Sequence, residues 1–196
     1  MDVLLTFSRH KLRNELLRCC HCDAWADAVL SRFPFSTDEE ARAALDECWG
    51  KLTPADYLQA IAAHPAVGDK QALRDKFAPS RSGWEAVEQA ASAEASETVL
   101  TELSELNRLY LEKNGFVFLV CASGKPASEI LSLLKARLPN DRDTELKNAV
   151  EEQRKITQLR FSRLLADIAA AAATTTTTAG RGGGGTDSKM CVRSRV

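Results

Sequence analysis

The sequence predicts an all-α fold, a single helical bundle of about eight helices followed by a disordered C-terminal tail. Three observations support this fold class. Helix-start residues recur along the chain, apolar residues return every three to four positions, and only one conspicuous segment has the composition of a strand. Because a lone strand has no partner with which to form a sheet, the packed layers should all be helices.

The strongest helix signals lie in TDEEARAALDECWGK and TPADYLQAIAAH. Thr37 can cap the first of these helices, and Glu40 can close a capping box. Thr53 can cap the second, with Pro54 at its first helical position. The other expected helices share apolar residues at i, i+3, i+4 and i+7 and cover residues 9–19, 24–32, 84–93, 97–113, 127–137 and 142–168.

The strand-like segment is GFVFLVCASG, bounded by Gly115 and Gly124. Its β-branched and aromatic residues favour an extended or short helical conformation threaded through the bundle. Backbone N–H and C=O groups in such a segment must find partners outside a sheet, and a ligand could supply some of them.

Composition changes sharply after Ile168. The domain is therefore expected at 1–168, and residues 169–196 are expected to form a low-complexity Ala/Thr/Gly linker or tail without ordered structure. The glycine run lacks the flanking strand, helix and GK[ST] signature of a phosphate-binding loop.

Composition also excludes several classes of protein. With 26 basic and 27 acidic residues the net charge is -1, so no overall field attracts nucleic acid or an anionic membrane. No apolar run approaches the ~20 residues that cross a bilayer, and the N-terminal apolar stretch is too short for a secretory signal. The protein is expected to stay inside the cell, with its six cysteines as reduced thiols.

The run CCHC at 19–22 could suggest zinc binding. Adjacent side chains point in divergent directions, however, and no second Cys/His pair with zinc spacing follows. Packing of Cys19 and Cys20 in the core is the interpretation that the pattern favours.

Three polar residues stand out by their positions. His64 lies on the inner face of a helix that Pro65 terminates, and it is either a partly buried histidine or an acid/base group. Arg160 lies on the apolar stripe of the last helix, where its charge needs an anionic partner unless the side chain reaches solvent. Glu88 is either a solvated helix residue or a carboxylate that completes a site with the other two.

The chain resembles the OHCU decarboxylase family, which acts on 2-oxo-4-hydroxy-4-carboxy-5-ureidoimidazoline. The resemblance rests on AHPAVGDK, VEQAA, LNRLYLEKNGFVFLVCA and ELKNAVEEQRKITQLRF, in that order. It begins at a CC, WA and FPF pattern formed by Cys19, Cys20, Trp25, Ala26, Phe33, Pro34 and Phe35, and it extends to about Leu165.

The resemblance implies an all-helical, cofactor-free homodimer that performs the last step of urate degradation and yields (S)-allantoin. It places the catalytic residues on His64, Glu88 and Arg160. The implied substrate contacts are Pro65, Gln89, Phe116, Val117, Phe118, Leu119 and Val120.

Two positions depart from the family pattern. Glu85 replaces a serine that often precedes the glutamate by three residues, and Val117 replaces a proline. Glu85 removes a serine contact and adds negative charge, which is expected to weaken binding of an anionic substrate. It is also the feature that most favours an alternative, a non-catalytic helical partner of a full-length fusion enzyme.

The chain is similar to the decarboxylase half of plant proteins in which this activity is fused to a transthyretin-like 5-hydroxyisourate hydrolase. The resemblance therefore implies functional coupling to such a hydrolase. The last three residues, Ser194-Arg195-Val196, are a variant of a peroxisomal address, so the expected location is the peroxisome or the cytoplasm.

Overall fold

The computed structural model describes residues 7–64 and 89–179. Within these residues the chain forms seven α-helices and no strand, which confirms the all-α prediction. The helices are α1 (Arg9–Cys19), α2 (Asp23–Ser31), α3 (Asp38–Trp49), α4 (Pro54–Ala62), α6 (Gln89–Asn114), α7 (Ala127–Arg137) and α8 (Arg142–Ala179). None of the described helices has an apolar stretch long enough to cross a membrane.

The predicted caps of α3 and α4 are present. The Thr37 side chain accepts a hydrogen bond from the backbone N–H of Glu40, and Thr53 forms a full capping box with Asp56. The Glu40 carboxylate instead accepts from the backbone N–H of Ser36, one residue before the cap (2.6 Å). Both helix starts are therefore fixed by local chemistry.

Two helix boundaries differ from the predictions. Helix α6 is continuous from Gln89 to Asn114, whereas separate helices were expected over 84–93 and 97–113. No glycine or proline lies between these two segments to interrupt the helix. Helix α8 continues to Ala179 and not only to residue 168, because alanine, the strongest helix former, follows the expected end.

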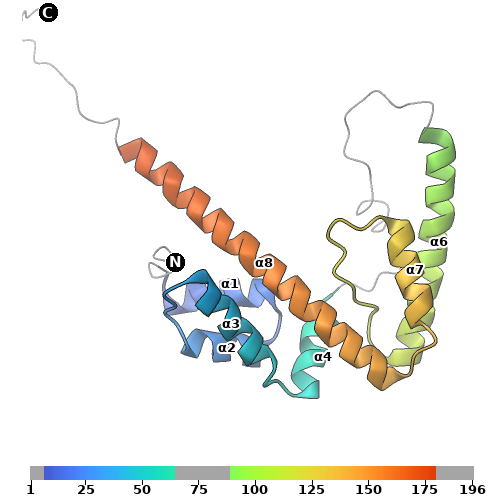
Figure 1. Ribbon diagram of the computed structural model, residues 1–196, viewed down its shortest axis with the longest axis horizontal. Helices are drawn as coiled ribbons and strands as arrows, with labels where there is room; N and C mark the ends of the chain where they lie inside the picture. Colours follow the sequence, from blue (N-terminus) through green and yellow to red (C-terminus); the bar gives the residue numbers. More distant parts are fainter. Residues whose placement is uncertain (1–6, 65–88, 180–196) are drawn as a thin grey trace, which may run out of the picture.

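Helix α8 is the longest described element; it runs past the group of α1 to α4, and α6 and α7 lie at its N-terminal end (Figure 1). It packs against α1, α3, α4 and α6. Buried side chains of α1, α2 and α3, together with Ala60 and Phe161, form a first core. Those of α6, α7 and the segment between them, together with Ile61 and Ala149, form a second core.

The two cores meet at α4 and α8. Neighbouring residues of α4, Ala60 and Ile61, belong to the first and second cores respectively. Helix α8 contributes Phe161 to the first and Ala149 to the second. The end of α4 is consequently positioned between the two cores.

The segment between α6 and α7 is non-helical, as its composition predicted, with turns at its glycine boundaries. Gly115 and Gly124 both have φ of 75°, a conformation that is strained for other residues. Gly115 ends α6, and its N–H donates to the carbonyl of Leu111 (2.8 Å).

Arg137 and Glu145 fix the middle of this segment. The Arg137 guanidinium donates to the carbonyl of Leu119 (2.9 Å) and lies 4.7 Å from the centre of the Phe118 ring. Glu145, which is 0% exposed, accepts from Arg137 (2.9 Å) and from the Tyr110 hydroxyl (2.5 Å). A buried carboxylate with such partners fixes the geometry around it, because breaking the pair would leave an uncompensated charge.

Hydrogen bonding determines the ionisation of Glu145. Burial alone raises its pKa, but hydrogen bonds from Arg137, Tyr110, Asn140 and Asn148 together outweigh burial, and the net pKa lies below the ordinary 4.5. A carboxyl group with a lowered folded-state pKa stabilises the fold above its unfolded pKa. That stabilisation is lost as pH falls through the folded-state pKa.

We expect Glu145→Gln to lower the free energy of unfolding at pH 7 by about 3–5 kcal/mol, because Arg137 loses its buried counter-charge. The difference in free energy of unfolding between the two proteins should narrow as pH falls from 4.5 through the lowered folded-state pKa of Glu145, because the wild-type carboxylate then becomes protonated. Urea denaturation across this pH range measures both effects. Glu112→Gln, at an exposed ion pair, serves as the control, and a gap that is independent of pH would contradict the assignment.

Candidate functional site

His64 lies just beyond the end of α4 and points toward α8. Its backbone N–H donates to the carbonyl of Ile61 (3.1 Å), and its half-buried ring places Nε2 at 2.6 Å from Oε1 of Gln153. The inward orientation predicted for this histidine is therefore confirmed, with an α8 side chain as a partner.

Gln153 and Thr157 form a buried polar pair on α8. Gln153 is fully buried, and its Nε2 donates to Oγ1 of Thr157 one turn along the helix (3.2 Å). The Thr157 hydroxyl donates in turn to the backbone carbonyl of Gln153 (2.9 Å). Neither residue was predicted to belong to the site, although two polar residues on an otherwise apolar stripe were a detectable signal.

Arg160 continues the same line along α8, seven residues after Gln153, so the two side chains share a face of the helix. It is half-buried, and its Nη1 donates to the carbonyl of Cys19 at the last residue of α1 (3.3 Å). A carbonyl accepts a hydrogen bond but carries no full negative charge. Arg160 is thus suited to hold an anionic ligand near His64.

The apolar segment reaches α8 next to Gln153. Phe116, Phe118 and Leu119 are buried, Val117 and Val120 are half-buried, and all five belong to or pack on the second core with Ile61. The next residue, Cys121, donates its backbone N–H to the carboxylate of Glu152 (2.7 Å). This contact anchors the end of the predicted substrate-binding segment at the turn of α8 that also holds His64.

Three predicted site residues are not placed with the others. Glu88 and Pro65 lie outside the described residues, as does Glu85. Gln89 is the first residue of α6. Of the three predicted catalytic residues, the structure therefore positions two: His64, which contacts Gln153 of α8, and Arg160, which lies on the same face of α8 as Gln153.

An open groove of about 670 Å³ borders the other side of the apolar segment. Val120, Cys121, Arg137, Glu152 and Lys155 are among its lining residues, whereas His64 and Arg160 are not. Its charged groups are paired within the protein, for example Lys155 with Glu152 at 2.6 Å. The groove is therefore separate from the line of polar residues on α8.

Cys19 and Cys20 of the CCHC run pack in the core, as the sequence pattern favoured. Cys19, Cys20 and Cys22 are buried and His21 is exposed. Burial raises the pKa of Cys19 to about 11 and that of Cys20 to about 12, so both remain protonated thiols at neutral pH. Within the described part of the chain, no cluster of three or more Cys, His, Asp or Glu side chains could hold a metal ion.

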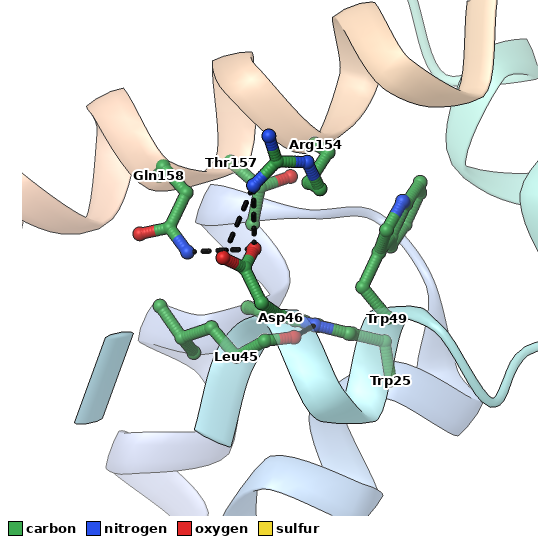
Figure 2. A pocket seen from close by; sticks show the side chains of 7 residues that line it. All are labelled: Trp25, Leu45, Asp46, Trp49, Arg154, Thr157 and Gln158. Atoms are coloured by element: carbon green, nitrogen blue, oxygen red, sulfur yellow. Dashed lines mark hydrogen bonds and ion pairs between the residues drawn. The ribbon is translucent and has the colours of Figure 1, made fainter. Parts of the chain in front are cut away.

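An ionic cluster fixes the rotation of α8 against α3 (Figure 2). Asp46 of α3 accepts from Arg154 (3.0 Å to each carboxylate oxygen) and from Nε2 of Gln158 (2.9 Å). Figure 2 shows Trp25 and Trp49 beside this cluster. With these residues directed at α3, the line of Gln153, Thr157 and Arg160 faces α4 and α1.

We expect Thr157→Val to lower the free energy of unfolding by about 1–3 kcal/mol, because the buried amide of Gln153 loses its acceptor. Thr157→Ser keeps the hydroxyl and should restore most of this stability. Ser162→Ala is the matched control, since Ser162 also donates to the carbonyl four residues earlier but is only half-buried. Urea denaturation measures these free energies. Equal losses of free energy of unfolding in Thr157→Val and Ser162→Ala would refute the stabilising role of the Gln153–Thr157 pair.

Comparison with known proteins identifies the family. The OHCU decarboxylase family model matches residues 6–162. The uric acid degradation bifunctional protein TTL of Arabidopsis thaliana is 37% identical over 153 residues, which cover 77% of this chain but only 46% of that relative. The 2-oxo-4-hydroxy-4-carboxy-5-ureidoimidazoline decarboxylase of Amia calva is 30% identical over 144 residues, covering 74% of this chain and 81% of the relative.

A solved structure agrees with these matches. A crystal structure of OHCU decarboxylase in the presence of (S)-allantoin superposes with a TM-score of 0.62 at 32% identity, covering 78% of this chain and 98% of that one. The matched region includes every residue of the candidate site, described or not. The chain therefore belongs to the OHCU decarboxylase family.

Proposed function

We propose that the protein decarboxylates 2-oxo-4-hydroxy-4-carboxy-5-ureidoimidazoline to (S)-allantoin, the last step of urate degradation. Family membership and the names of the related proteins support this reaction. The observation that carries the proposal is that half-buried His64, at the end of α4, contacts Gln153 on the face of α8 that also carries half-buried Arg160.

The reaction makes modest chemical demands on the protein. Loss of CO2 leaves an electron pair on the former carboxylated carbon, which the adjacent imine and carbonyl of the substrate can delocalise. The protein must then position the substrate, exclude water and deliver a proton.

Each site residue has a role in this scheme. Arg160 anchors the carboxylate or a carbonyl oxygen of the substrate through charge-assisted hydrogen bonds. His64 transfers the proton at the stereocentre or the 4-hydroxyl group. Glu88, outside the described residues, orients the hydroxyl or a ring nitrogen of the substrate.

The apolar segment completes the proposed site. Phe116 to Val120 exclude water, and their backbone groups bind the ureido or ring atoms of the substrate. Arg137 and Glu152 hold this segment from α7 and α8, so its backbone is positioned before substrate arrives.

Two properties of the assembly are also proposed. The Arabidopsis relative is named a bifunctional protein, and this chain spans 46% of it. Coupling to a transthyretin-like 5-hydroxyisourate hydrolase would give the decarboxylase a direct supply of its substrate. A homodimer and peroxisomal location remain predictions from the sequence.

We expect His64→Asn to reduce turnover by about 10²–10⁴-fold, because proton transfer loses its acid/base group. Formation of (S)-allantoin from freshly generated substrate can be followed by circular dichroism, together with CO2 release. His21→Asn, which changes an exposed histidine, should retain full activity.

Normal turnover by folded His64→Asn would overturn the proposed function of this residue. Absence of turnover in the wild-type chain, with retained binding to a full-length fusion enzyme, would instead favour the non-catalytic partner. The two results are distinguishable because the second does not depend on the variant.

Arg160→Gln should lower kcat/KM by about 10–100-fold, the loss expected when a charge-assisted hydrogen bond worth about 1.5–3 kcal/mol is removed. Arg163→Gln, an exposed position less than one turn along the same helix, is the matched control. Steady-state kinetics of both variants measure the effect. Equal kinetics for the two variants would contradict substrate anchoring by Arg160.

A further inference from the structure

We propose that Gln153 is a positioning residue that holds the ring of His64 with a proton on Nε2. The inference rests on the proposed function of His64 and deepens it. It follows from one hydrogen bond between His64 and Gln153 and from two hydrogen bonds between Gln153 and Thr157 within α8.

The orientation of the Gln153 side-chain amide follows from the hydroxyl of Thr157. It has one hydrogen, which it donates to the backbone carbonyl of Gln153 (2.9 Å). With that hydrogen used, Oγ1 can only accept from the Gln153 side chain. The atom of Gln153 at 3.2 Å from Oγ1 must therefore be the amide nitrogen.

The other end of the same amide contacts the ring of His64. With its NH2 group directed at Thr157, Gln153 presents Oε1 to the histidine, 2.6 Å from Nε2. A carbonyl oxygen is only an acceptor, so Nε2 must carry a hydrogen.

The reversed amide satisfies fewer groups. Gln153 would then donate to Nε2 of His64, and Thr157 would have to donate to Oε1 of Gln153. Its hydrogen bond to the backbone carbonyl would be lost, leaving two hydrogen bonds in place of three. Because Gln153 and Thr157 are both buried, water does not readily replace the missing bond.

This arrangement suits a proton-transfer residue. The Oε1 atom accepts from Nε2 in both the neutral and the charged form of the ring, so the ring keeps one orientation when its protonation state changes. The backbone hydrogen bond from His64 to Ile61 fixes the other end of the residue. The productive orientation therefore exists before substrate binds.

The tautomer can be measured on the full chain without substrate. The sequence has three histidines, so long-range proton–nitrogen NMR spectra of ¹⁵N-histidine-labelled protein contain three ring systems, and His64→Asn assigns the ring of His64. We expect neutral His64 to carry its proton on Nε2. A wild-type spectrum with the proton on Nδ1 would overturn the proposal.

Variants of Gln153 test whether this residue determines the tautomer of His64. Gln153→Leu places methyl groups against Nε2 and should increase the fraction with the proton on Nδ1, whereas Gln153→Glu keeps an acceptor oxygen and should retain the Nε2 proton. Gln158→Leu, five residues along α8 and bonded to Asp46, is the matched control and should leave the tautomer unchanged. An unchanged tautomer in Gln153→Leu would refute positioning by Gln153.

Kinetics provide the second readout. Gln153→Leu should lower kcat by about tenfold or more, a part of the contribution expected of the acid/base group, with a smaller change in KM. Gln153→Glu should recover part of this loss. Equal loss of kcat in both variants would contradict the proposal, while a wild-type chain without turnover would refute the proposed function and leave the NMR test decisive for the tautomer.

Discussion

The hydrogen bond between His64 and Gln153 joins the end of α4 to α8 at the place where the two cores meet. The buried amide of Gln153 must keep its hydrogen bonds, because an unsatisfied polar group in the interior costs about 1–3 kcal/mol. Thr157 satisfies one end of this amide and His64 the other. The requirement for satisfied buried polar groups thereby sets the position of the proposed catalytic histidine.

The rest of the fold brings α8 into the orientation that this hydrogen bond needs. Asp46 holds α8 against α3 through Arg154 and Gln158, on the side of the first core. On the side of the second core, Glu145 at the start of α8 holds Arg137, which in turn binds the apolar segment. Neither ionic group uses the side chains of Gln153 or Arg160, so these two remain directed at the end of α4 and at α1.

Polar residues on an apolar helix stripe have a double role in this protein. Gln153 and Thr157 satisfy each other, whereas Arg160 has a backbone carbonyl of α1 as its partner. Among the described residues this carbonyl is the hydrogen-bond partner of Arg160, and a carbonyl supplies no full negative charge. A carboxylate substrate would provide that charge, which links the composition of α8 to the chemistry of an anionic ligand.

The sequence by itself determined the fold class, most helix positions and the unusual placement of His64 and Arg160. These features depend on local rules, such as capping residues and the spacing of apolar side chains, that act within a few turns of helix. The family resemblance added the role of Glu88, which lies outside the described residues. The continuous helix α6 was not predicted, although Glu94 and Ala95, between the two expected segments, are good helix formers.

Only the tertiary structure decided which side chains meet. His64 and Gln153 are 89 residues apart in the sequence, and Cys121 and Glu152 are 31 apart. The spacing of apolar residues does not specify such pairs, since each pair depends on the position and rotation of α8 relative to the neighbouring helices. The two cores and the ionic groups beside them fix that placement, and through it the hydrogen bonds that prepare His64 for proton transfer.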